Sequence, residues 1–260
     1  MYKIMIDPGH GGKDRLKRSN KGPTGYVEAD GVLDISLKLR DFLLATGAFE
    51  VKLTREKDVS VGVRTRGKMA AEWGADLFIS EHSNATGRPN NTTIRGTEVY
   101  SSVDLNDEAL AAEMSKAIAD VIGTKNRGAK KVESNKYQGE DYYGVIDAAQ
   151  DDGVAHILLI ENAYHDNKED EALLKDANMR MAIAKAQAGV ICRFYGVKEK
   201  EESALNWKQK IVQEAFDLGL FTDKTWVDKA EEASTVWFVC AIAINLYKKI
   251  KGMTNDSENK

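Results

Sequence analysis

The feature that most limits the fold of this chain is an alternation of short apolar segments with longer segments of helical periodicity. Short apolar runs predict strands, and apolar residues spaced three and four apart predict helices. The expected strands are Lys3–Ile6, Glu50–Leu53, Leu77–Ser80, Gly96–Tyr100 and Ile157–Ile160, and the expected helices are Val32–Ala45, Val63–Trp73, Asn106–Ile122 and Met179–Tyr195. This alternation predicts an α/β fold, with a mostly parallel twisted sheet flanked by helices.

The carboxy-terminal part of the chain has a different pattern. The segment "GVKEKEESA" at 196–204 is charged and lacks apolar periodicity, so we predict one domain over residues 1–197 and a linker over 198–204. Residues 205–252 have apolar residues at helical spacing and predict a small all-α module. The last residues, 253–260, are expected to form a disordered tail.

Composition and charge argue against several classes of partner. The chain has 260 residues and a formal net charge of −4, so we expect neither nucleic acid nor an anionic membrane surface as its main partner. The longest apolar run, "VWFVCAIAI" at 236–244, is shorter than the roughly 20 residues that span a bilayer, so no transmembrane segment is expected. The amino terminus has neither the basic nor the apolar region of a signal peptide, and the two cysteines are expected to be buried thiols.

Two histidines are placed where strands end. The turn "IDPGHGG" at residues 6–12 presents His10, and its glycine spacing matches neither of the common nucleotide-binding loops. His82 follows the apolar strand of "DLFISEHSNA". A single loop histidine is more often structural than a ligand. The two imidazoles can form a metal site only if their strands lie close together, and a catalytic zinc ion then needs a third nitrogen or oxygen ligand.

Two glutamates are the next candidates. Glu28 in "GPTGYVEADG" comes just before a helix, where a solvated acid favoured by the helix dipole is the ordinary interpretation. Glu161 in "HILLIENAYHDN" directly follows the apolar residues of a buried strand. An acid in that position is either a partner in a structural salt bridge or a general base with a raised pKa beside a metal, and the residues alone leave both open.

Together these segments resemble the zinc-dependent N-acetylmuramoyl-L-alanine amidases (amidase type 3), including phage and prophage endolysins, which cleave bacterial peptidoglycan. The resemblance covers residues 1–197 and depends on four motifs in order, "IDPGHGG", "GYVEADG", "ADLFISEHSNA" and "LLIENAYHDN". It implies that His10, Glu28 and His82 are zinc ligands. It also implies that Glu161 is the catalytic acid and base.

The resemblance implies a reaction as well. A zinc-bound water would hydrolyse the amide bond between the lactyl group of N-acetylmuramic acid and L-alanine of the stem peptide, with Glu161 moving the protons. The alternatives are a non-catalytic peptidoglycan-binding protein and a zinc peptidase of the stem peptide. Asn84 is predicted to contact substrate or to cap its loop, and Arg55 and Arg66 suit structural ion pairing. Glu81 should point away from His82 because side chains alternate along a strand.

The biological setting follows from the same resemblance. An endolysin would be synthesised in the bacterial cytoplasm without a signal peptide and would act on the cell wall after release, and a host autolysin is the alternative. The module over 205–252 would then attach to the wall, with Trp207, Trp226 and Trp237 against glycan, or it would join two copies into a homo-oligomer. Tryptophan at helical spacing is more often part of a core.

Overall fold

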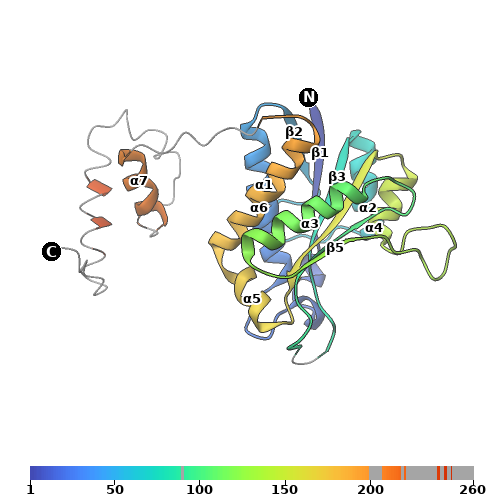
Figure 1. The fold of residues 1–260 in the computed structure, drawn as a ribbon, viewed down its shortest axis with the longest axis horizontal. Coiled ribbons are helices and arrows are strands. Elements are labelled where there is room, and N and C mark those ends of the chain that lie inside the picture. Colours follow the sequence, from blue (N-terminus) through green and yellow to red (C-terminus); the bar gives the residue numbers. More distant parts are fainter. Residues whose placement is uncertain are drawn as a thin grey trace. The chain divides into compact units, whose positions relative to one another are not determined.

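The computed structural model describes residues 1–88, 91–198, 207–217, 220, 239–240, 243–244 and 247. The chain divides into two compact units, Met1–Lys200 and Glu201–Lys260 (Figure 1). In the smaller unit the described helix is α7 (Trp207–Asp217). Most of the predicted linker, the predicted tail, and Trp226 and Trp237 of the predicted module lie outside the described residues.

The larger unit is built around one sheet. Within the described residues this sheet has six strands, which lie in the order β2 (Phe49–Leu53), β1 (Tyr2–Pro8), β3 (Leu77–Asn84), β6 (His156–Tyr164), β4 (Thr97–Ser101) and β5 (Asn126–Lys130). The first four strands run parallel to one another. Strand β4 is antiparallel to β6 and parallel to β5. The predicted α/β fold with a mostly parallel sheet is therefore confirmed, with a reversed pair of strands at one edge.

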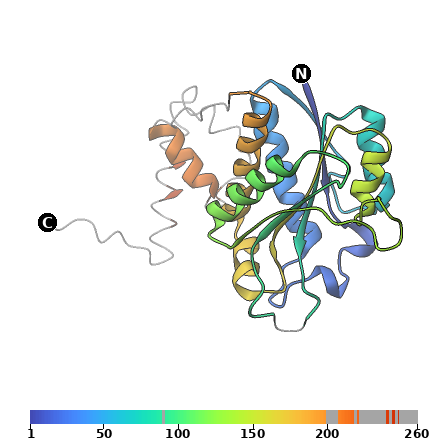
Figure 2. The same cartoon turned by 45° about the vertical axis from the view of Figure 1, so that its right-hand side comes forward.

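Helices cover both faces of this sheet (Figure 2). One face carries α1 (Glu28–Ala45), α3 (Glu108–Ile122) and α6 (Ala177–Phe194). The opposite face carries α2 (Val63–Trp73) and α4 (Gly144–Asp151), which pack against each other. Because both faces are covered, the central strands must be apolar on both sides, as in parallel sheets generally.

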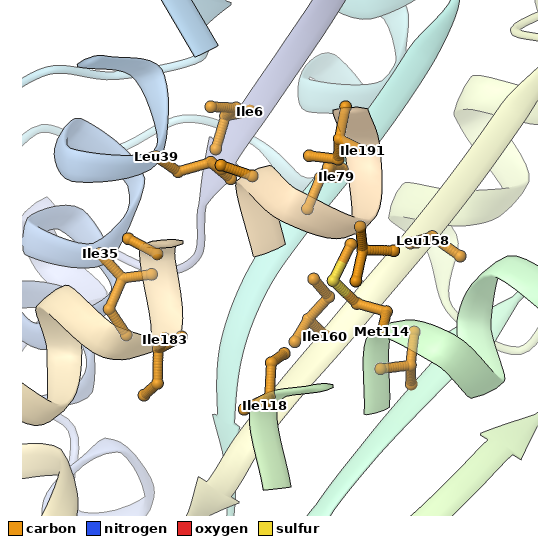
Figure 3. Close-up of a cluster of buried hydrophobic side chains, with 14 of the residues drawn as sticks. Ile6, Ile35, Leu39, Ile79, Met114, Ile118, Leu158, Ile160, Ile183 and Ile191 are labelled. Atoms are coloured by element: carbon orange, nitrogen blue, oxygen red, sulfur yellow. The ribbon is translucent and has the colours of Figure 1, made fainter. Parts of the chain in front are cut away.

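The main core lies between the sheet and the α1–α3–α6 layer (Figure 3). Alternate residues of the central strands point into it, namely Ile4, Ile6, Leu77, Ile79, Leu158 and Ile160, all without exposed surface. The intervening residues, such as Phe78 and Leu159, pack against α2 and α4 in a second cluster. Strand alternation continues beyond these apolar residues, so His82 and Glu161 face the α2–α4 side.

The predicted boundaries differ from the observed ones at the ends that matter for function. Strands β3 and β6 extend past the predicted ends at Ser80 and Ile160, so His82 and Glu161 lie within strands rather than after them. Helix α1 begins at Glu28 rather than at Val32. Gly31 lies in the first turn of α1, where the lack of a side chain makes room for Tyr26. A Cβ atom added to Gly31 would lie 2.1 Å from the hydroxyl oxygen of Tyr26.

One strand and two α-helices of the larger unit were not predicted. Edge strand β5 reads "NRGAK" and has no apolar run, and α4 and α5 (Lys168–Lys175) are each eight residues long. Among the described residues, no helix is both long and apolar enough to cross a membrane. Cys192 and Cys240 are buried free thiols, as expected.

Candidate active site

The glycine-rich turn after β1 brings His10 next to β3. His10, Gly11 and Gly12 have φ angles of 57°, 101° and 57°, so three successive residues have a positive φ, which glycine adopts most readily. Gly9 has a different role, because a Cβ there would lie 2.3 Å from Cε1 of His82. The glycines therefore reverse the backbone and also allow the two imidazoles to approach each other.

Two buried arginines hold this turn in place. Arg66 forms an ion pair with Asp7, with Nη1 2.6 Å from Oδ1, and donates to the carbonyl oxygens of Pro8 at 2.7 Å and His10 at 2.6 Å. Arg55 donates from Nε to the same oxygen of Pro8 at 2.8 Å. Burial, together with the charge of Arg66, lowers the pKa of Arg55 to about 10. The ion pairing predicted for Arg66 is confirmed, whereas Arg55 bonds to backbone oxygens.

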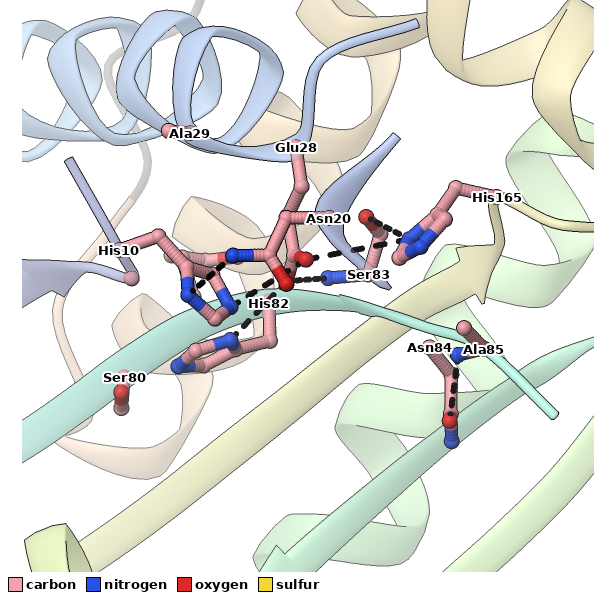
Figure 4. A network of polar contacts seen from close by, with 12 residues as sticks. His10, Asn20, Glu28, Ala29, Ser80, His82, Ser83, Asn84, Ala85 and His165 are labelled. Atoms are coloured by element: carbon pink, nitrogen blue, oxygen red, sulfur yellow. Dashed lines mark hydrogen bonds and ion pairs between the residues drawn. The ribbon is translucent and has the colours of Figure 1, made fainter. Parts of the chain in front are cut away.

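Glu28 lies between the two imidazoles (Figure 4). Its Oε2 is 3.2 Å from Nε2 of His10, and its Oε1 is 3.0 Å from Nδ1 of His82. It is the first residue of α1 and only 2 % exposed, so it is not a solvated acid. Burial acts to raise the pKa of Glu28, but the hydrogen bonds to His10 and His82 outweigh burial and hold this pKa below its ordinary value.

These three side chains form a cluster suited to a metal ion. One ligand atom from each of His10, Glu28 and His82 lies within 4.8 Å of the other two. Two imidazole nitrogens and one carboxylate oxygen are a donor set typical of catalytic zinc, which keeps its fourth position open for water. Within the described part of the chain the ionic partners of Glu28 are histidines, so a bound cation would balance its buried charge.

Glu161 faces the same cavity as the histidines. It is the register partner of His82 across β3 and β6. The cavity has a volume of about 200 Å³, and its walls include His10, His82 and Glu161 together with apolar side chains from α2 and α4. His10, His82 and Glu161 are therefore brought together in one cavity, and Glu28 joins them through its contacts with the two histidines.

The surroundings of Glu161 favour its neutral form. The side chain is buried, and Oε2 has no hydrogen-bond partner among the described residues. Burial raises the pKa of Glu161 well above its ordinary value, and the carboxylates of Glu28, Glu98 and Glu81 raise it further. Of the two interpretations left open by the sequence, a structural salt bridge does not describe this residue, for which no ion pair is found in the described part of the chain.

Glu81 and His165 lie near the cluster but are occupied elsewhere. Glu81 points to the opposite face of the sheet, where Nδ2 of Asn162 donates to it at 2.8 Å, and burial raises its pKa to about 7. His165 is buried, and although its Nδ1 lies 3.9 Å from Oε2 of Glu28, its closer contacts are Oγ of Ser83 on β3, 2.9 Å from Nδ1, and the carbonyl oxygen of Ser19, 2.8 Å from Nε2. Neither side chain lines the cavity of Glu161.

Several polar residues around the site were missed by the sequence analysis. Nδ2 of Asn20 lies 2.9 Å from Nδ1 of His10, and Asn20 ends a 3₁₀ helix of three residues, Arg18–Asn20, which has no apolar pattern. Glu98 is the antiparallel register partner of Glu161, and only the alternation in "TEVY" could have placed it on this face. Asn84, by contrast, was singled out from the sequence, and it donates to Oε1 of Glu98 at 2.6 Å and accepts from the Ala85 amide at 2.8 Å.

The fold and the site define an α/β protein with a candidate metal centre at one end of its sheet. The sequence profile of the family described as N-acetylmuramoyl-L-alanine amidase matches residues 4–193, so the chain belongs to this amidase family. The resemblance noted from the motifs is thereby confirmed.

Known relatives agree with this assignment. The chain is 31% identical over 204 residues to an endolysin of Bacillus phage SPP1, an alignment that covers 76% of this chain and 67% of the endolysin. It is 30% identical over 202 residues to the N-acetylmuramoyl-L-alanine amidase CwlM of Bacillus licheniformis, covering 76% and 71%. The catalytic domain of the amidase CwlV from Paenibacillus polymyxa aligns with a TM-score of 0.65 at 28% identity, covering 76% of this chain and 100% of that domain.

Proposed function

We propose that this chain hydrolyses the amide bond between the lactyl group of N-acetylmuramic acid and L-alanine of the peptidoglycan stem peptide. The observation that carries the proposal is the position of Glu161, in one cavity with His10 and His82, which form a cluster with Glu28. Membership of the amidase family supports the same substrate class. In this proposal His10, Glu28 and His82 hold a zinc ion.

The chemistry divides between the metal and the chain. A bound zinc ion would supply a Lewis acid and lower the pKa of its water from about 15.7 to about 7. Glu161 in its carboxylate form accepts the proton of the attacking water, and the carboxylic acid so formed donates it to the departing amine of L-alanine. A carboxyl group whose pKa is raised by burial can do both near neutral pH. The apolar side chains of Val63, Val145 and Leu159 line this cavity and limit its water.

We also propose that the protein is a phage or prophage endolysin that acts on the bacterial cell wall. The 31% identity to the phage SPP1 endolysin supports this origin. Substrate contact by Asn84 and wall attachment or self-association by residues 205–252 stay predictions. Binding of the fluorescently labelled full chain to purified cell walls tests wall attachment. Sedimentation of the chain alone tests self-association.

The reaction is tested by mass spectrometry of purified peptidoglycan digested with the full chain. We expect free stem peptides that begin with L-alanine, no new reducing ends, loss of activity with a chelator and recovery with zinc. Shortened peptides still joined to glycan would replace the amidase proposal by a zinc peptidase. An unchanged sacculus would favour a peptidoglycan-binding protein.

The role of Glu161 has its own prediction. Glu161→Gln should reduce turnover by about 10²- to 10⁴-fold, the usual contribution of a general acid and base. Zinc affinity, measured by competition with a chromophoric chelator, should stay close to that of the unchanged chain, whereas His82→Ala should lose the metal. Turnover by Glu161→Gln at the unchanged rate contradicts the assignment.

A further inference from the structure

A second cavity adjoins the one that contains Glu161. Its volume is about 380 Å³, and it lies over β4 and β5 at the reversed edge of the sheet. Tyr143, at the start of α4, lines both cavities, so the two share a wall. The proposed mechanism uses none of the charged side chains of this second cavity.

Register pairs lead across the sheet from the first cavity towards the second. His82 pairs with Glu161, and Glu161 pairs with Glu98. Two residues further along β4, Tyr100 pairs with Lys130 of β5. Strands lie about 4.8 Å apart, so the cations of β5 begin roughly 10 Å from the strand of Glu161. An extended peptide covers this distance with about three residues.

The second cavity has an excess of positive charge. Its walls contain three basic side chains, Arg88, Arg127 and Lys130, against one acid, Glu98. The chain as a whole has a net charge of −4, so this local balance is opposite to that of the molecule. Partly enclosed cations without matching acids attract an anionic ligand.

Both carboxylate oxygens of Glu98, the single acid of this cavity, already accept hydrogen bonds. Oε1 of Glu98 accepts from Asn84 and from the hydroxyls of Tyr100 and Tyr164, at 2.6, 2.9 and 3.0 Å. Oε2 accepts from Nε of Arg127 at 2.7 Å and from Nζ of Lys130. One carboxylate therefore faces two cations, which leaves one positive charge in excess.

Arg127 keeps donors for a ligand. Among the residues that the structure describes, its hydrogen bond to Glu98 uses Nε, and its two terminal nitrogens make none. Its guanidinium also lies over the ring of Tyr164, with Cζ 5.3 Å from the ring centroid. The side chains of Arg127 and Lys130 are 26% and 32% exposed, so both reach the cavity. A planar guanidinium with free terminal nitrogens suits a carboxylate.

We propose that Arg127 and Lys130 bind a carboxylate on the peptide part of the substrate, two or three residues beyond the amide bond that is cleaved. This inference depends on the proposed function, which places the reacting amide beside Glu161. Glu98 holds the two cations in position and takes no part in binding. The pair makes the enzyme select an acidic stem peptide over one whose carboxyl groups are amidated.

The test is calorimetric binding to the full chain with Glu161→Gln, loaded with zinc. The two probes are N-acetylmuramoyl-L-alanyl-D-glutamic acid and the same compound with both carboxyl groups amidated. We expect the diacid to bind about tenfold more tightly, because charge-assisted hydrogen bonds are the stronger class. The preference should decrease with added salt, since these cations are partly exposed.

Variants assign the preference to the two cations. Arg127→Gln and Lys130→Gln are each added to Glu161→Gln, and each leaves Glu98 with one cation. Each should reduce the ratio of the affinities for the diacid and the diamide at least about threefold. Arg127→Lys keeps the charge but lacks the planar guanidinium, so its preference should lie between those of Glu161→Gln alone and of the Arg127→Gln variant, which separates lost binding from lost folding. Lys116→Gln removes a cation on α3 that is 66% exposed and outside the cavity, and should change nothing.

Two results would overturn the proposal. One is equal affinity for the diacid and the diamide, including no measurable binding of either at millimolar concentration. The other is a preference that survives both glutamine substitutions. Product analysis with the unchanged chain tests the amidase reaction separately. Release of stem peptides without a diacid preference rejects only the carboxylate site, and a diacid preference without amide cleavage rejects only the reaction.

Discussion

The pKa values of two buried glutamates at the candidate site are shifted in opposite directions. Hydrogen bonds to His10 and His82 outweigh burial at Glu28 and lower its pKa, so it is an anion suited to a cation. Glu161 is surrounded by apolar side chains and other carboxylates, which raise its pKa. Two residues of one type are thereby fitted for different tasks by their neighbours alone.

At Gly9 the absence of a side chain decides the geometry of the candidate metal site. Gly9→Ala places a methyl group against the ring of His82 and should weaken zinc binding by about 10- to 100-fold, as displaced ligands generally do. Competition with a chromophoric chelator measures this. Gly47→Ala is the control, because that glycine has a φ of 72° but nothing within 4 Å of the added Cβ. Equal zinc affinity in both variants contradicts the steric argument.

Glu81 makes stability depend on pH. Burial raises its pKa from 4.5 to about 7, so between these values the folded chain holds a proton that the unfolded chain has lost. The free energy of unfolding therefore falls as pH rises through this window, by at most about 3 kcal/mol. Glu81→Gln removes this term and keeps an acceptor for Asn162.

Urea unfolding at pH 5 and pH 8 measures the effect of Glu81. The free energy of unfolding of Glu81→Gln, minus that of the unchanged chain, should be larger at pH 8 than at pH 5. The same pH dependence in both proteins would show that Glu81 is not the group that titrates.

At the scale of elements, apolar patterning predicted the strands and helices that build the core. Helix α2 was predicted with its observed bounds, and β1, β2, β3, β4 and β6 were all found. Strand β5 was missed because an edge strand needs no apolar run. The ends of β3 and β6 were missed because the strands continue into polar residues whose partners are distant in sequence.

The candidate site was likewise predicted only where a short segment of sequence carries a motif. His10, Glu28, His82 and Glu161 stand in recognisable motifs, and the structure places them together. Their surroundings are contributed by residues with no local signal, since Asn20 ends a 3₁₀ helix of three residues and Arg127 and Lys130 lie on the missed strand. Pairing between strands brings these residues near the site, and that pairing is not encoded in any short segment.

The α1 helix offers a stability test at this scale. Leu39 has no exposed surface and packs in the main core, so Leu39→Ala should lower the free energy of unfolding by about 2–5 kcal/mol. Leu44, in the same helix, is 45% exposed, and Leu44→Ala should change it by less than about 1 kcal/mol. Urea denaturation compares the two variants, and equal losses would contradict the assigned face of α1.

At the scale of the whole molecule, all candidate catalytic residues lie in the first compact unit. We expect a chain of residues 1–200 to unfold cooperatively and to cleave a soluble muramyl peptide at a rate within about threefold of the full chain, since the unit has its own core. Thermal unfolding and product analysis check both statements. A large loss of cleavage with an intact fold would assign residues beyond 200 to the reaction.

Strand β6 occupies the centre of the sheet although it is the last of the six strands in the chain. Until it is in place, β3 and β4 have no common neighbour, and the two halves of the sheet cannot join. The strand that completes the sheet is also the one that brings Glu161. During synthesis at the ribosome, such a hydrolase would therefore gain its catalytic power only once its fold had closed.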